Sequence, residues 1–282
     1  MQKIIPNLWF DKQGQEATAF YTKLFKNSNV GPIARFEAEA VKVSGMPEGS
    51  VLTVEFQLEG YKFIALNSGP IFKFTPAISF FVNCETVDEI DKLWAGLSQG
   101  GSVLMEYQKY PFSEKYGWLH DKYGLSWQLS LAKYPHKIRL ALMYVGKQAG
   151  KAEEAINMYV ALFPDSKIGM ISRYGNTSAP DAEGTINHGV FTIMGQEFIA
   201  MDSAYPHKFT FTEAISLMVQ CKDQAEIDRY WQKLSEGGEE QPCGWLKDKY
   251  GLSWQIVPME LNEMLQNPNQ VKRQGVMRSF CR

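Results

Sequence analysis

Three pairs of polar residues stand at matching places in the two halves of the chain, on segments that alternate between apolar and polar side chains. The pairs are Thr53 with His188, Asn67 with Asp202, and Gln128 with Gln255. Such groups on one face of a sheet can hydrogen-bond an organic molecule, or they can satisfy one another. The sequence predicts a cleft lined by these six residues and leaves both uses open.

Other kinds of chemistry find no support in the residue pattern. The sequence has no Gly-x-Ser-x-Gly turn, no Cys/His pair at a telling spacing and no glycine-rich phosphate loop. Cys84 and Cys221 end apolar segments at matching places, so we expect them to be buried free thiols. These observations predict no cofactor.

The elements that position the polar pairs are duplicated. Residues 117–128 and 244–255 are identical except that His120 is replaced by Lys247. Other landmarks recur in the same order; Trp94, for example, returns as Trp231. A repeat of this length predicts two copies of a small domain. We place copy one at residues 1–135, copy two at 136–258 and a polar, helical tail at 259–282.

Hydrophobic periodicity predicts the same element order in both copies. The predicted elements are strands at 4–10, 51–58, 62–67, 78–82, 125–131, 186–193 and 197–202, and helices at 15–25, from 86 and at 225–234. The segment from Thr86 to Glu89 is a capping box that opens its helix. The predicted fold class is α+β, with two βαβββ modules per copy forming curved mixed sheets around a cleft.

Bulk properties limit the partners. The chain has 282 residues and a formal net charge of −2, with a pI near 6.1. This balance gives no electrostatic footprint for nucleic acid. No segment has the length of a membrane span, and the N-terminal apolar run is too short for a signal peptide. We therefore expect a cytoplasmic protein that binds neither nucleic acid nor membrane.

Three motifs resemble a known family. They are Phe-Tyr-x-x-Leu-Phe at 20–25, the Asp-Glu-Ile-Asp-x-Leu-Trp helix at 88–94, and the block at 117–128 with its later copy. They are similar to the PhnB-like branch, also called 3-demethylubiquinone-9 3-methyltransferase, of the glyoxalase, bleomycin-resistance and extradiol-dioxygenase (vicinal oxygen chelate) superfamily. The resemblance covers nearly the whole chain. It implies tandem glyoxalase-like domains packed as an intramolecular pseudo-dimer, and a higher oligomer stays open.

The resemblance also implies where a metal would bind. Catalytic members of the superfamily hold a divalent metal through His and Glu side chains. Carried over by position, these ligands fall on Pro6, Ala65, Ala77 and Gln128, and on Leu140, Ala200, Ala214 and Gln255. Such side chains are poor or impossible ligands. We predict no metal site and a small-molecule-binding protein of unknown ligand. The alternative is a lyase- or dioxygenase-type enzyme with a divergent site.

The copies differ most just before the repeated block. Copy one has Ser102–Tyr116 there, with Tyr107 and Phe112 among its aromatic residues, whereas copy two has only Glu239–Cys243. An aromatic loop beside a cleft can close over a ligand, so we expect the cleft beside Ser102–Tyr116 to be the better one. If the copies exchange walls, as related dimers do, His188 and Asp202 line that cleft. Thr53 and Asn67 then line the other cleft.

Overall fold

The computed structural model describes residues 2–36, 45–176 and 179–261, together with residues 41, 264 and 275. Most of the predicted tail therefore lies outside the described residues. Within them the chain forms sixteen strands and four α-helices, which confirms the α+β class. None of the described helices combines the length and the apolar character needed to cross a membrane.

Copy one contains two βαβββ modules in sequence. Their elements are β1 (Ile4–Phe10), α1 (Gly14–Leu24), β2 (Asn29–Arg35), β3 (Val51–Leu58), β4 (Tyr61–Asn67), β5 (Ile78–Cys84), α3 (Val87–Ser98), β6 (Ser102–Tyr110), β7 (Ser113–His120) and β8 (Ser126–Leu131). The Thr86 hydroxyl accepts a hydrogen bond from the Glu89 N–H at 3.2 Å, so the predicted cap forms.

Copy two repeats the order with shorter final strands. Its elements are β9 (Ile138–Val145), the short helix η1 (Gly146–Gln148), α4 (Ala152–Leu162), β10 (Lys167–Arg173), β11 (Ile186–Ile193), β12 (Gln196–Ser203), β13 (Ile215–Cys221), α5 (Gln224–Ser235), β14 (Glu239–Glu240), β15 (Trp245–Lys247) and β16 (Ser253–Pro258). The strands predicted at 4–10, 51–58 and 186–193 have the predicted bounds.

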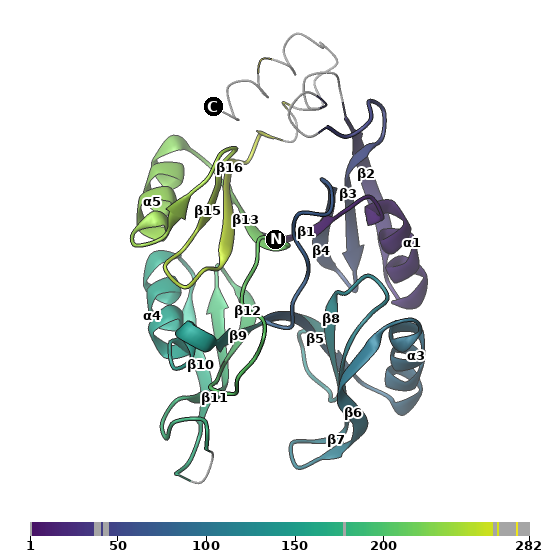
Figure 1. The fold of residues 1–282 in the computed structure, drawn as a ribbon, viewed down its shortest axis with the longest axis vertical. Coiled ribbons are helices and arrows are strands. Elements are labelled where there is room, and N and C mark those ends of the chain that lie inside the picture. Colours follow the sequence, from purple (N-terminus) through teal and green to yellow (C-terminus); the bar gives the residue numbers. More distant parts are fainter. Residues whose placement is uncertain are drawn as a thin grey trace.

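The two copies share both sheets. Sheet A has the order β14-β15-β16-β13-β1-β4-β3-β2, and sheet B has the order β10-β11-β12-β9-β5-β8-β7-β6. The copies join where β1 pairs antiparallel with β13 in sheet A, and where β5 pairs antiparallel with β9 in sheet B. In Figure 1 copy one lies on the right and copy two on the left, and each sheet crosses between them. Every sheet thus combines one module from each copy.

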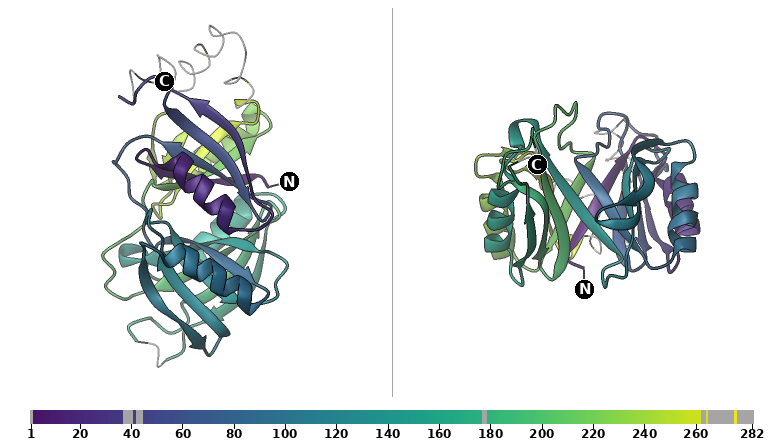
Figure 2. Two further views of the ribbon diagram at one scale, coloured as in Figure 1. Left: turned by 90° about the vertical axis from the view of Figure 1, so that its right-hand side faces the viewer. Right: turned by 90° about the horizontal axis from the view of Figure 1, so that it is seen from below.

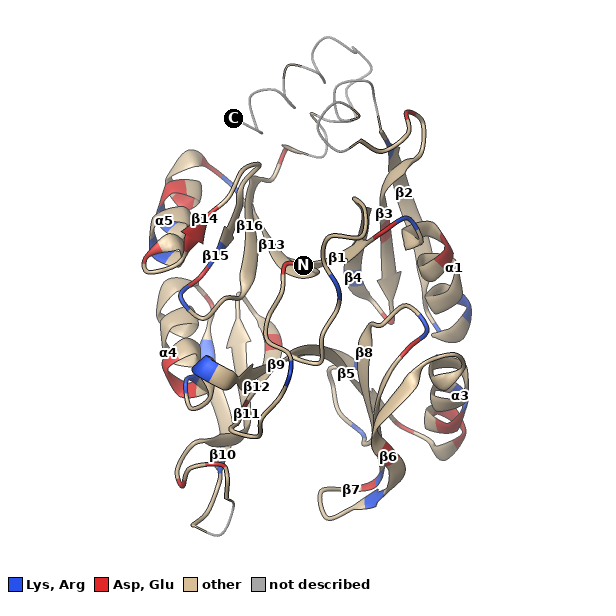
Figure 3. Ribbon diagram, in the orientation of Figure 1, with Lys and Arg blue, Asp and Glu red and all other residues tan. Residues whose placement is uncertain are grey.

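The helices cover one face of each sheet. Figure 2 shows them on the outer flanks, with the sheets curving between them. Charged residues gather on these helices and in the turns (Figure 3). Beneath the helices lies a continuous apolar core that includes Tyr21, Phe63, Phe80 and Trp127. Because side chains alternate along a strand, every second residue points to the opposite face of the sheet, away from these four helices. In sheet A, Leu261 packs on that face with Ile5, Ile64, Met218 and Val257.

The repeated block is explained by this core. The buried Asp121 carboxylate accepts hydrogen bonds from the Tyr21 hydroxyl at 2.6 Å and the Trp127 indole at 2.9 Å, and from two backbone N–H groups. Asp248 makes the same four contacts in copy two. Since Tyr21 belongs to the first module and Asp121 to the second, the block joins the modules of one copy. Its role at Asp121 is therefore structural.

Copy one's extra segment is a hairpin and not a loop. We expected Ser102–Tyr116 to supply a strand with a covering loop, but β6 and β7 pair along their length and leave only a short turn between Tyr110 and Ser113. The segment therefore extends sheet B at its edge. Copy two keeps only the two-residue strand β14 in its place.

Candidate functional site

The sides of the two sheets that point away from α1, α3, α4 and α5 carry most of the polar residues singled out above. We call that side of sheet A face A, with Asn7, Trp9, Thr53, Ser216, Trp245, Ser253 and Gln255. We call that side of sheet B face B, with Ser79, Phe81, Tyr116, Gln128, Arg139 and His188. Face B combines strands β6 and β7 of copy one with His188 of copy two, so the expected exchange of walls is present in the sheet order.

Asn67 and Asp202 lie on the opposite, helix-covered sides, which corrects the face we expected for them. The Asn67 amide oxygen accepts from the Gly14 N–H at 2.8 Å, at the start of α1. The Asp202 carboxylate accepts from the N–H groups of Ala152 and Ile186, both at 3.0 Å. Unpaired N–H groups at a helix start need such acceptors. Both residues therefore cap helices.

The two aromatic residues of the hairpin have different positions. Tyr107 stacks on Trp94 of α3 at 4.6 Å between ring centroids and donates to the Asp91 carboxylate, so it packs on the helix side. Phe112 lies at the hairpin tip, exposed, with its ring 5.1 Å from that of Tyr116. Only Phe112 is thus placed at the rim of face B.

The paired glutamines are both buried, but their hydrogen bonds differ. The Gln128 amide donates to the Ser79 hydroxyl at 2.8 Å and accepts from the Tyr116 hydroxyl at 2.7 Å. Burial raises the pKa of Tyr116, which keeps its hydroxyl protonated as a donor. The Gln255 amide makes the matching bond to Ser216 at 2.8 Å. Copy two has Cys243 where copy one has Tyr116, so no tyrosine bonds the Gln255 carbonyl.

The centre of face B is Phe81, on the strand where the two copies join. Its half-buried ring lies 6.2 Å from the Tyr116 ring, 6.4 Å from the His188 ring and 5.1 Å from the Arg139 guanidinium. Burial, and then the charge of Arg139, lower the pKa of His188, which favours an uncharged imidazole. The ring hydrogen-bonds to none of the described residues, so both nitrogens can bond a ligand.

Arg139 stands where copy one has Ile5, and other residues of copy one and copy two contact its guanidinium. Its guanidinium donates to Glu197 at 3.3 Å and lies 4.2 Å from the centre of the Tyr134 ring. Only 5% of Arg139 is exposed, and its Nε has no partner among the described groups. A charge in an otherwise apolar strand was a signal in the sequence that our prediction missed, as it missed Phe81 and Tyr116.

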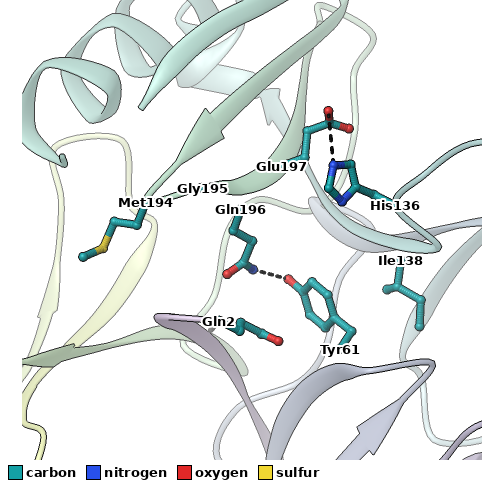
Figure 4. Close-up of a pocket in the computed structure, with 8 residues that line it drawn as sticks. All are labelled: Gln2, Tyr61, His136, Ile138, Met194, Gly195, Gln196 and Glu197. Carbon is teal, nitrogen blue, oxygen red and sulfur yellow. Dashed lines mark hydrogen bonds and ion pairs between the residues drawn. The ribbon is translucent and has the colours of Figure 1, made fainter. Parts of the chain in front are cut away.

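Two cavities lie beside Glu197, and the first of them is lined by residues of both copies. One, of about 290 Å³, is lined by Gln2, Tyr61, His136, Ile138, Met194, Gly195, Gln196 and Glu197 (Figure 4). The other, of about 540 Å³, is lined by His136, Asp165, Ser166, Lys167, Thr192, Gly195 and Glu197. In the first, the Gln196 amide donates to the Tyr61 hydroxyl at 2.7 Å, which joins the two copies. None of the predicted site residues lines either cavity.

The residues on the two faces do not fit a divalent metal. Pro6 and Ala65, two of the positions implied by resemblance, lie on the helix-covered side, since Ala65 faces Gly14 of α1. Among the described residues no group of three or more His, Cys, Asp or Glu could hold a metal ion. The donors on the faces are mainly amides and hydroxyls, with His188 as the imidazole, and this set suits neither zinc nor iron.

Comparison with known proteins gives a family and a fold. The family model described as 3-demethylubiquinone-9 3-methyltransferase matches residues 2–130 and again residues 136–257. A putative 3-demethylubiquinone-9 3-methyltransferase, a PhnB protein from Bacillus cereus, is 44% identical over 46% of this chain and 100% of that chain, with a TM-score of 0.43. A Staphylococcus aureus protein is 31% identical over 47% of this chain and 98% of that chain, with a TM-score of 0.20. Glyoxalase I from Zea mays shares the fold, with a TM-score of 0.56 and 11% identity over 95% of this chain and 97% of that chain. No curated protein matches.

Proposed function

Because the chain belongs to the 3-demethylubiquinone-9 3-methyltransferase (PhnB-like) family of the vicinal oxygen chelate superfamily, we propose that it binds a small organic molecule on face B without a metal. The observation that carries the proposal is the half-buried Phe81 ring, which faces away from the described helices and which Tyr116, His188 and Arg139 surround. Ligand sites typically combine apolar and aromatic surface with a few convergent polar groups.

The polar groups around Phe81 favour an aromatic ligand with a hydrogen-bonding substituent. Gln128 and Tyr116 bond each other and hold the floor rigid. His188 offers an uncharged donor and acceptor. A ring stacked on Phe81 would gain aromatic contact, and its substituent would reach the imidazole.

Methyl transfer, which the family model's name suggests, has no support in these residues. The turn from β1 into α1 carries no glycine-rich loop. The first N–H of α1, at Gly14, is already bonded to Asn67 and is not free for a cofactor.

A lyase-type enzyme is the second candidate, favoured by His188 alone. An uncharged imidazole that hydrogen-bonds to none of the described residues can accept a proton from a bound substrate. Turnover of a ligand that binds at Phe81, lost in His188→Gln while binding persists, would favour this candidate over a binding protein.

The test is a binding screen with matched variants. Purified protein is mixed with aromatic acids, phenols and amides, and binding is followed by ligand-observed NMR. Phe81→Ala should weaken binding of a hit about tenfold or more, because an aromatic contact and apolar burial are lost. Thr53→Ala, at the place in copy one that matches His188, is the control and should change nothing. No hit, or equal effects of the two variants, would contradict the proposal.

The metal-free part is tested separately by elemental analysis. The protein should purify without stoichiometric zinc, nickel, iron or manganese. About one tightly held metal per chain that disappears in Gln128→Ala would show that this part is wrong.

A further inference from the structure

Buried polar groups on face B are hydrogen-bonded to one another, whereas some of the matching groups on face A have no partner among the described residues. On face B, two hydrogen bonds join polar groups near Gln128. Trp118 donates to the Ser126 hydroxyl at 2.8 Å, and Tyr116 donates to Gln128. On face A the matching residues are Trp245, Ser253 and Gln255, and the first bond is missing. The Ser253 hydroxyl is fully buried and has no partner among the described groups.

A second buried polar group on face A is also unsatisfied. Asn7 is 6% exposed, and its amide oxygen has no partner among the described groups. Asn7 pairs across the sheet with Ser216, and Ser216 pairs with Ser253, so the three residues form one row over β1, β13 and β16. Copy two has Ala141 where copy one has Asn7. An unsatisfied buried acceptor costs stability, and this one is present in only one of the two copies.

Two tryptophans meet above this row. The rings of Trp9 and Trp245 lie 6.0 Å apart, edge to face, and Phe72 lies 4.9 Å from Trp9. Their strands, β1 and β15, are separated by β13 and β16, which places their backbones roughly 14 Å apart. The two tryptophan side chains therefore extend toward each other over the row of Asn7, Ser216 and Ser253. Both tryptophans are half-buried, and the Trp9 indole is fixed by a bond to the Gly69 carbonyl at 2.8 Å.

Trp118, the counterpart of Trp245 in copy one, makes a hydrogen bond that Trp245 lacks among the described residues. The Trp245 indole N–H bonds to none of the described residues, whereas the Trp118 indole bonds Ser126. If Trp245 turned as Trp118 does, it would satisfy Ser253 and leave a gap beside Trp9. The shortened hairpin of copy two has no residue like Tyr116 to fill that gap.

We propose that face A binds a flat, uncharged aromatic molecule bearing an N–H group, between Trp9 and Trp245 and with its N–H bonded to the Asn7 amide oxygen. Trp245 turns to donate to Ser253 when the molecule enters. The row consists of neutral amides and hydroxyls, and the nearby cation Lys247 is already paired with Glu213 at 3.1 Å and Glu239 at 2.7 Å. A charged ligand would lose its hydration there without gaining a counter-charge. The site is distinct from the Phe81 site on face B.

The test uses two probes that differ in one N–H group. 2-Quinolone is flat and uncharged and carries the N–H, and 1-methyl-2-quinolone lacks it. Calorimetry on the full-length protein should show 2-quinolone binding at least about tenfold more tightly, the factor expected for one buried hydrogen bond. No binding of 2-quinolone, or equal affinities, would overturn the proposal.

Variants assign the contact to face A. Asn7→Leu should weaken 2-quinolone binding about tenfold and remove the difference between the probes. Trp245→Ala should also weaken binding, while Trp118→Ala, on face B, should not. An affinity that depends on Trp118 and not on Trp245 would contradict the site.

Two further readouts separate a ligand site from a structural role. Without probe, Asn7→Leu should raise the melting temperature by about 2–4 °C, because it removes an unsatisfied buried acceptor at similar volume. A lower melting temperature would mean that Asn7 supports the fold, against the proposal. The Trp245 indole N–H resonance should shift when 2-quinolone binds, and Ser253→Ala should change that shift; an unmoved resonance would rule out the proposed turn.

Discussion

At the scale of single residues, Asp121 shows how a repeated residue serves the fold. One of its oxygens accepts from a tyrosine hydroxyl and an indole N–H, and the other accepts from two backbone N–H groups. In Asp121→Asn an amide N–H would face the Trp127 indole N–H, and neither could accept. We expect a loss of about 2 kcal/mol in the free energy of unfolding, measured in urea. Asp88→Asn, on the exposed first turn of α3, is the control; a similar loss there would contradict this account.

His188 predicts a pH dependence. Burial and the charge of Arg139 lower its pKa from the usual value of 6.5. The unfolded chain therefore binds a proton at His188 more readily than the folded protein, so stability falls as the pH drops below about 6.5. His188→Thr, which installs the residue of copy one, should lose less stability than the wild type between about pH 7 and pH 5. Urea unfolding at both pH values measures this; parallel losses in the two proteins would show that His188 does not contribute.

At the scale of elements, a glycine of the repeated block sets how β7 packs on α3. A Cβ added at Gly117 would come within 2.3 Å of the Trp94 ring, which cannot yield while it stacks on Tyr107. Gly117→Ala should therefore cost about 1–3 kcal/mol of unfolding free energy through overpacking, measured by chemical denaturation. Gly175→Ala adds a Cβ with nothing within 4 Å and serves as the control. Equal stabilities of the two variants would show that the Trp94 contact relaxes at no cost.

Sequence periodicity predicted the strands better than it predicted their faces. β3 alternates from Val54 onward, and both β3 and β11 have the predicted bounds. Alternation also placed Asn67 and Ala65 on one side correctly, but it does not say which side the helix covers. β2 and β10 were not predicted, because these edge strands are exposed and carry little alternation. Asn7 was missed because the search relied on pairs, and its partner position holds Ala141.

At the scale of the whole molecule, the duplication has produced two unequal faces. Sequence reasoning favoured the face beside the longer hairpin, since more aromatic residues lie there. The hydrogen bonds suggest a different division: the longer hairpin supplies Tyr116, which satisfies Gln128 from within the chain. The shorter hairpin leaves the matching glutamine and serine of face A without those partners. The two faces would then select different ligands, and a variant on one face should leave binding on the other unchanged.

The joining strands also predict what half of the molecule would do alone. In residues 1–135, β1 would lose β13 and β5 would lose β9, so two apolar strands would become sheet edges. Ile4 and Leu8 of β1 are fully buried in the whole chain, and exposed edges of this kind pair with other chains. Since β13 is the repeat of β5 and β9 is the repeat of β1, two such halves can rebuild both sheets by pairing β1 of each with β5 of the other. We expect residues 1–135 to form a twofold dimer or to aggregate, as measured by light scattering after size exclusion. A stable monomer at high concentration would show that each copy completes its own sheets, against the pairing seen in β1–β13 and β5–β9.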